Sequence, residues 1–225
     1  MRAALDGCVA AALILLPAAA AHAQEVPGQA PIGAHGNAFE LGIAGGYAQS
    51  FSPASTTGSN GAVLTTGAGG ALEVDLGWRA SSNVAIGAWG HGAQLGITAA
   101  QAPPAIPRNL YEAAAGLGGT WHFLPSAAHL DPWVALGTGW RGQWFGYGNG
   151  AIYAEHGLEL VRGRVGLDVR VSRSVAIGPI VGGTLDAYLT EQLPGGRWVA
   201  VSGRPLAGSF FAGIRGTLDA PLGSR

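Results

Sequence analysis

The chain has 225 residues, of which 39 are glycine, 48% are hydrophobic and only 11% are charged. Each glycine destabilises a helix by about 1 kcal/mol relative to alanine, so helices are disfavoured. The glycines have no three-residue period, which excludes collagen, and the hydrophobic content excludes a disordered chain. The net charge of −1, with twelve arginines and no lysine, indicates that nucleic acid is not a partner.

The first 23 residues have the order of a secretory signal peptide. Arg2 precedes the apolar run Val9–Leu16, and Ala21-His22-Ala23 forms a small-x-small cleavage site. The apolar run is too short to cross about 30 Å of hydrocarbon as a helix. We therefore expect a leader over residues 1–23, a short periplasmic segment over 24–37, and an exported protein without a transmembrane helix. The one cysteine, Cys8, lies in the leader, so no disulfide is expected.

Eight later segments alternate apolar and polar residues with period two, the pattern of strands whose two faces meet different surroundings. In one of them, Val165 and Leu167 share a face, whereas Arg162 and Arg164 share the other. The same phase places Glu159 on the apolar face, at the strand's start. We predict strands at Ala38–Ser50, Ala71–Trp78, Val84–Leu95, Leu110–Phe123, Trp133–Phe145, Leu158–Val171, Val175–Leu189 and Ala207–Leu218.

The polar faces carry acidic residues and arginines together, among many glycines and alanines. An unpaired buried charge destabilises a protein by several kcal/mol, so these groups are expected to pair. Hairpin register places Arg162 opposite Thr184 and diagonal to Asp186. The predicted lumen network consists of Glu40, Glu73, Asp75, Arg79, Glu112, Arg141, Arg162, Arg164, Asp168, Arg170, Asp186 and Arg215.

The connections between these segments alternate between short and long. Arg79–Asn83 and Ser172–Ser174 are short, whereas Ser52–Gly70 and Thr190–Leu206 are long and rich in Gly, Ser, Thr and Pro. Transmembrane up-and-down barrels have short periplasmic turns and longer external loops. The fold prediction is therefore all-β, an eight-stranded antiparallel up-and-down transmembrane β-barrel over residues 38–219, with a tail over 220–225. A secreted soluble lipocalin-like binding barrel, with its apolar face inward, is the alternative.

Aromatic residues fall at both ends of the predicted strands. Transmembrane barrels carry such girdles at the two membrane interfaces. One band lies at the short turns and one at the long loops, and together the predicted membrane-interface aromatics are Phe39, Tyr47, Trp78, Trp121, Phe123, Trp144, Tyr188 and Phe210.

With this leader, these eight segments and these girdles, the chain resembles the small eight-stranded outer-membrane β-barrel proteins, the group of OmpX-, OmpW- and OmpA-type barrels. The resemblance covers Ala38–Asp219 and is one of pattern, without a short motif. It implies an outer-membrane location, lipids and the barrel-assembly machinery as partners, and a monomer. One departure is the end of the chain: such barrels usually finish on an aromatic residue, whereas this sequence continues as Ala220-Pro221-Leu222-Gly223-Ser224-Arg225.

For function, the sequence favours a structural or surface-interaction role with a lumen closed by ion pairs, since eight strands leave an interior that side chains can fill. One alternative is a narrow passive channel past Arg141, Arg162 and Arg164. Another is an OmpW-like lateral route for small apolar molecules. Pro179 motivates that route because it removes a ladder hydrogen bond, although such a proline more often marks a β-bulge.

Catalytic and metal-binding signals are weak. His91 and His122 are predicted to point inward with no serine beside them, and Glu155-His156 falls in a predicted loop. We therefore expect no enzyme, with a lipid A-modifying enzyme as the remaining alternative, and no cofactor. No pair among His35, His91, His122, His129 and His156 has ligand spacing along the chain, so no metal site is predicted.

Overall fold

The computed structural model describes residues 36–51, 67–97, 107–124, 129–147, 152–192, 196–201 and 206–222. These residues form strands only: β1 Ala38–Phe51, β2 Gly67–Arg79, β3 Val84–Ile97, β4 Pro107–His122, β5 Leu130–Tyr147, β6 Ile152–Arg170, β7 Val175–Gln192, β8 Trp198–Ala200 and β9 Leu206–Pro221. Within these ranges, no helix has the length and apolar character needed to cross a membrane.

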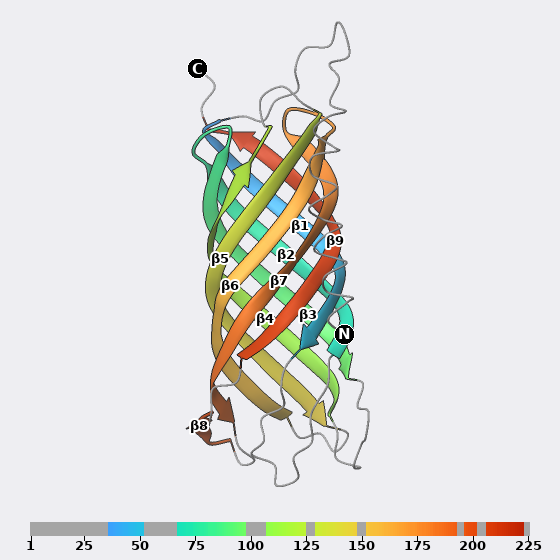
Figure 1. Cartoon of the computed structure of the whole chain (residues 1–225), viewed down its shortest axis with the longest axis vertical. Helices are drawn as coiled ribbons and strands as arrows, with labels where there is room; N and C mark the ends of the chain where they lie inside the picture. Colours follow the sequence, from blue (N-terminus) through green and yellow to red (C-terminus); the bar gives the residue numbers. More distant parts are fainter. Residues whose placement is uncertain are drawn as a thin grey trace, which may run out of the picture.

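Eight of the strands close into a barrel (Figure 1). Each pairs antiparallel with its neighbour from β1 to β7, β9 joins β7 to β1, and the β6–β7 pairing completes the ring. The eight predicted segments are β1 to β7 and β9. The three-residue β8 was not predicted: it lies in the predicted loop Thr190–Leu206 and extends the sheet beside the end of β7. Figure 1 shows β8 at the bottom of the barrel and the C-terminal end of β9 at the top.

The outer wall of the barrel is apolar and its interior is charged. The charged side chains described on the strands are all buried, apart from Asp75, whose side chain is 32% exposed. Large apolar side chains point outward, including Ile43, Leu72, Leu117, Leu136, Ile177 and Ile214, which are 49% to 69% exposed. A soluble barrel has the opposite arrangement, so the lipocalin-like alternative is wrong. The chain is a transmembrane β-barrel of the outer-membrane type.

Glu159 corrects the predicted phase of β6. Leu160 and Val161 both point outward, at 40% and 49% exposure, and together they face Thr138 alone on β5. This is a β-bulge, which adds one residue and reverses the alternation on its far side. The hydroxyl of Thr138 donates to the Glu159 carbonyl oxygen at 2.8 Å. Glu159 therefore turns into the lumen, where it is fully buried, and not onto the apolar face.

Pro179 does not mark a bulge, contrary to the expectation. Its strand stays in register with both neighbours: Pro179 pairs with Ile214 on β9, and the β6–β7 ladder keeps equal spacing on both strands across this point. The missing N–H of Pro179 therefore leaves the register of the wall regular.

Ile43 tests the orientation of the wall, because it lies on β1 midway between the aromatic residues Phe39 and Tyr47 and is 49% exposed. Ile43→Arg is expected to lower the free energy of unfolding by about 2–4 kcal/mol, since a charge at the bilayer midplane is poorly solvated. Urea titration of the protein folded in lipid vesicles measures this change. The control Ile43→Leu should match the wild type, and an Arg variant as stable as the wild type would contradict the assignment of this face to lipid.

Candidate functional site

The twelve residues predicted for the lumen all point inward and belong to two separate networks of ion pairs. The short-turn network lies at the end of the barrel that holds the short hairpin turns, where β1 begins and β9 ends. It contains Glu40, Asp75, Arg79, His122, Asp131, Asp168, Arg170, Arg215 and Asp219. The long-loop network extends toward β8 and contains Glu73, His91, Glu112, Arg141, Glu159, Arg162, Arg164 and Asp186.

The short-turn network is centred on Glu40. Arg79 donates to its Oε2 at 2.6 Å, and Arg215 donates to its Oε1 at 2.7 Å. Arg170 donates to Asp219 at 2.9 Å. The three guanidinium groups come from β2, β6 and β9, so this network ties distant strands together at one end of the barrel.

The long-loop network crosses the lumen. Glu73 on β2 accepts from Arg162 and Arg164 on β6 at 2.7 and 2.6 Å, and these two strands stand opposite each other in the ring of eight. Nearer the long loops, Arg141 donates to Glu112 at 2.5 Å and to Glu159 at 3.1 Å. All six of these groups are buried, where charge-assisted hydrogen bonds are strong and unpaired charges are costly.

The partner of Arg162 differs from the one that hairpin register suggested. Arg162 does lie opposite Thr184, but its guanidinium reaches across to Glu73, and Asp186 instead lies 3.6 Å from Arg141. Register along one hairpin fixes which residues are neighbours on the wall. It does not fix which long side chain extends across the interior.

Two tryptophans separate the arginines from the wall. The Trp89 indole lies against Gly137, where an added Cβ would be 2.8 Å from the indole Nε1. The Arg162 guanidinium lies over the same indole, with its Cζ 4.2 Å from the ring centroid. Trp133 lies against Gly166 in the same way, with Arg215 at 4.8 Å from its ring. Each layer therefore runs from glycine to indole to guanidinium to glutamate, and the cation–π contact adds to the ion pair.

Several buried carboxylates were missed by the sequence analysis because the strands are longer than predicted. β5 begins three residues before its predicted start, β6 begins six residues earlier, and β7 and β9 each end three residues later. Continuing the inward alternation of β5 and β9 by a few residues would have found Asp131 and Asp219. The bulge in β6 reverses the phase, so the same step would not have found Glu155 and the predicted phase missed Glu159. The missed carboxylates are Asp131, Glu155, Glu159, Glu191 and Asp219.

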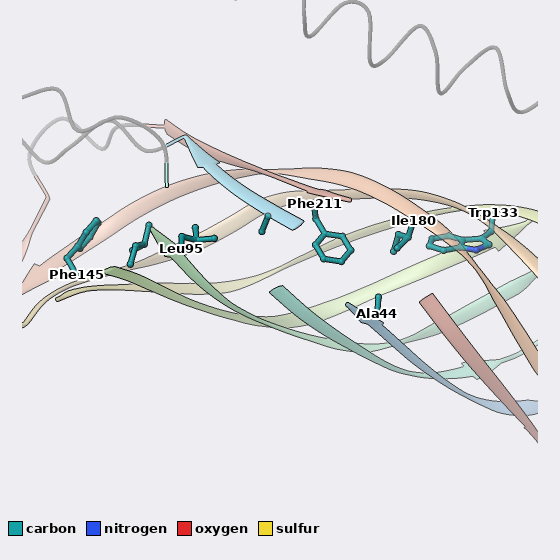
Figure 2. Close-up of a cluster of buried hydrophobic side chains, with 8 residues drawn as sticks. Ala44, Leu95, Trp133, Phe145, Ile180 and Phe211 are labelled. Atoms are coloured by element: carbon teal, nitrogen blue, oxygen red, sulfur yellow. The ribbon is translucent and has the colours of Figure 1, made fainter. Parts of the chain in front are cut away.

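Apolar side chains also enter the lumen. Figure 2 shows Phe145, Leu95, Phe211, Ile180 and Trp133 following one another along the inside of the barrel. They are buried and occupy the space between the ion-paired groups. A cavity of about 50 Å³ remains beside Trp89 and Trp133.

The predicted interface aromatics lie on the outer wall with one exception. Phe39, Trp78, Trp121 and Phe123 point outward near the short turns, and Tyr47 does so near the long loops; Trp144 and Phe210 point outward and are half-buried. Tyr188 is the exception, because its side chain is 1% exposed and lies in the lumen. Tyr188 lies two residues after the inward-pointing Asp186 on β7, so regular alternation turns it inward too. The register shift between β6 and β7 that interrupts the alternation comes only after Tyr188.

His156 lies on β6 and not in a loop. It points outward, 4.6 Å from the Trp198 ring of β8 and 5.3 and 5.6 Å from Trp140 and Trp144. Residues 52–66, 193–195 and 202–205 of the two long loops lie outside the described residues, as do His35 and the predicted leader.

Comparison with known proteins gives likeness in architecture alone. No family model matches the chain, and no curated protein resembles it in sequence. Among solved structures, it is similar to Neisserial surface protein A (10% identity, TM-score 0.49, 79% of this chain and 95% of that one). It is also similar to the outer membrane protein OprG from Pseudomonas aeruginosa (10%, 0.48, 84% and 99%) and to Ail, the attachment invasion locus protein of Yersinia pestis (9%, 0.43, 82% and 100%). At these identities no role is transferred from them to this chain.

Gly166 tests the layering of indole on glycine. Gly166→Ala is expected to lower the free energy of unfolding by about 1–3 kcal/mol, because the new methyl group would overlap the Trp133 ring in a filled interior. Gly163→Ala, on the same strand but with nothing within 4 Å of its Cβ position, is the matched control and should be close to neutral. Urea unfolding followed by circular dichroism compares the two. Equal effects would contradict the layering.

Glu73 tests the pairing across the lumen. Glu73→Gln leaves two buried guanidinium groups without their carboxylate and is expected to lower the free energy of unfolding by about 3–5 kcal/mol. Asp75→Asn, two residues along the same strand, removes only one contact of 3.6 Å from a partly exposed group and should change it by less than about 1 kcal/mol. The same urea titration measures both, and a neutral Glu73→Gln would show that the arginines do not depend on this carboxylate.

Proposed function

We propose that this outer-membrane β-barrel has a structural or surface-interaction role and that its lumen is closed by ion pairs. The observation that carries the proposal is the bridge from Glu73 on β2 to Arg162 and Arg164 on β6. Because these strands lie on opposite sides of the ring, any axial path must pass this bridge. The Trp89 indole packs against the Arg162 guanidinium and narrows the space beside the bridge.

The size of the cavity beside Trp89 and Trp133 supports the same proposal. A water molecule needs about 10–15 Å³ of such volume, so a cavity of about 50 Å³ holds only a few. Buried Arg141 and Glu112 lie on its long-loop side, and Arg79 and Glu40 lie on its short-turn side. A continuous water-filled pore would require at least one of these pairs to separate.

The proposed role includes no catalysis. His91 and His122 are buried in the lumen and contact the carboxylates of Glu73 and Asp131, at 3.2 and 2.9 Å. Ser50 and Ser209, the inward serines of the described strands, bond to Gln143 and Thr184 instead. No serine, histidine and acid come together among the described residues in a way that would activate a nucleophile.

The surface that remains for contact with other molecules is the long-loop end. There β8 extends the sheet beyond β9, and the side chains of Arg197 and Trp198 are exposed. Loop ends on a rigid barrel are the usual place for binding residues. We place the surface-interaction role at this end of the molecule.

Conductance in planar bilayers tests the closed lumen. The wild type is expected to give no steady channels, whereas Trp89→Ala combined with Arg162→Ala removes one whole layer and should give steps. The control pair Leu117→Ala and Leu136→Ala trims the outer wall of neighbouring strands and should stay silent. A gel mobility change on boiling confirms that each sample is folded. Steady wild-type channels that are lost in Arg141→Ala or Arg162→Ala would favour the passive channel and contradict the proposal.

A further inference from the structure

The short-turn network contains three side chains that can converge on one ion. His122 on β4, Asp131 on β5 and Asp168 on β6 each offer one ligand atom, and these atoms lie within 4.8 Å of one another. All three residues are at most 1% exposed. The sequence analysis predicted no metal site because it compared spacing along the chain, whereas these groups come from three neighbouring strands.

Each of the three side chains keeps an atom without a hydrogen-bond partner among the described residues. His122 contacts Asp131 Oδ2 through Nδ1 at 2.9 Å. Its Nε2 lies 3.8 Å from Glu40 Oε2 and forms no hydrogen bond, and neither do Asp131 Oδ1 and Asp168 Oδ2. The other oxygen of Asp168 accepts from the Trp133 indole at 3.0 Å. Buried polar atoms are almost always satisfied, so an unbonded atom on each of three converging side chains favours a ligand.

The charge of the short-turn network points the same way. Asp131 and Asp168 are direct cross-strand partners, a placement that repels like charges. Over the described residues of the network, five carboxylates face three guanidinium groups, an excess of two negative charges when His122 is neutral. One divalent cation would balance this excess. The members are Glu40, Asp75, Asp131, Asp168 and Asp219 against Arg79, Arg170 and Arg215.

We propose that His122, Asp131 and Asp168 bind one divalent first-row transition-metal ion inside the short-turn end of the barrel. Imidazole and carboxylate together suit ions such as Zn²⁺ and Mn²⁺. The Trp133 hydrogen bond orients the Asp168 carboxylate, as supporting groups around metal ligands do. The bound ion joins β4, β5 and β6 beside their turns and locks this end of the lumen.

The arginines nearby allow a competing arrangement. Arg170 and Arg215 lie 3.6 Å from Asp131 and Asp168, but their shortest contacts are with Asp219 and Glu40, at 2.9 and 2.7 Å. They reduce the negative charge of the site, and Arg215 Nη1 lies 3.6 Å from the unbonded Asp168 Oδ2 without forming a hydrogen bond to it. If they instead satisfy both carboxylates in solution, no metal is needed, and the experiment separates the two cases.

The test uses the untagged chain, folded in detergent and stripped with a chelator. Equilibrium dialysis against Zn²⁺ and, separately, Mn²⁺ is expected to load about one ion per chain and to raise the midpoint of thermal unfolding. His122→Gln and Asp168→Asn should each weaken binding at least tenfold. His91→Gln is the matched control, because His91 also contacts a buried carboxylate, Glu73, yet lacks a second acid at ligand distance, and it should bind as the wild type does.

Two results would overturn the site. A wild type that retains no ion with either metal excludes it directly, whether or not any variant folds. Binding that survives unchanged in both His122→Gln and Asp168→Asn places the ion elsewhere. Co²⁺ supplies a second readout, since its visible absorption reports coordination and should disappear in folded His122→Gln. None of these outcomes depends on whether the lumen conducts.

Discussion

The pairing of buried guanidinium groups with carboxylates is the constraint on which the rest of the barrel depends. The outer wall faces hydrocarbon, so the charged residues of the strands can only point inward, and there each must find an opposite charge. Glu73 receives two arginines from the opposite wall and Glu40 receives two from its own side. A strand order, length or tilt that prevented these contacts would leave buried charges unpaired and destabilise the barrel.

Glycine makes that pairing possible in so narrow an interior. A wall with a side chain at every inward position would leave no room for indoles and guanidinium groups in layers. At Gly137 and Gly166 the wall is thin enough for Trp89 and Trp133 to lie against the backbone, with Arg162 and Arg215 on their inner faces. At these two positions glycine is therefore what allows large aromatic and charged side chains to fill the barrel.

Period-two alternation was enough to locate the eight wall strands, whereas connection lengths and aromatic positions were needed to predict an up-and-down barrel with its arginines inward. The alternation itself follows from residue parity. It failed where parity changes. Leu160 adds a residue that turns Glu159 inward, and no local signal marks that bulge. The alternation also did not determine which side chains pair across the lumen. Arg162 contacts Glu73 and not Asp186, because hairpin register fixes only adjacent strands and not the relative height of opposite ones. The convergence of His122 with Asp131 and Asp168 lies beyond sequence reading for the same reason.

The bridge between β2 and β6 also bears on how the chain enters a bilayer. Those strands are separated by three others on either side of the ring, so Glu73 can meet its two arginines only after the cylinder has closed. An open sheet inserted before closure would carry bare ions into hydrocarbon. Insertion as a nearly closed cylinder, whose seam seals as it enters the bilayer, avoids exposing unpaired ions to hydrocarbon. The order of closure and insertion thus depends on the charged residues of the lumen rather than on the lipid-facing surface.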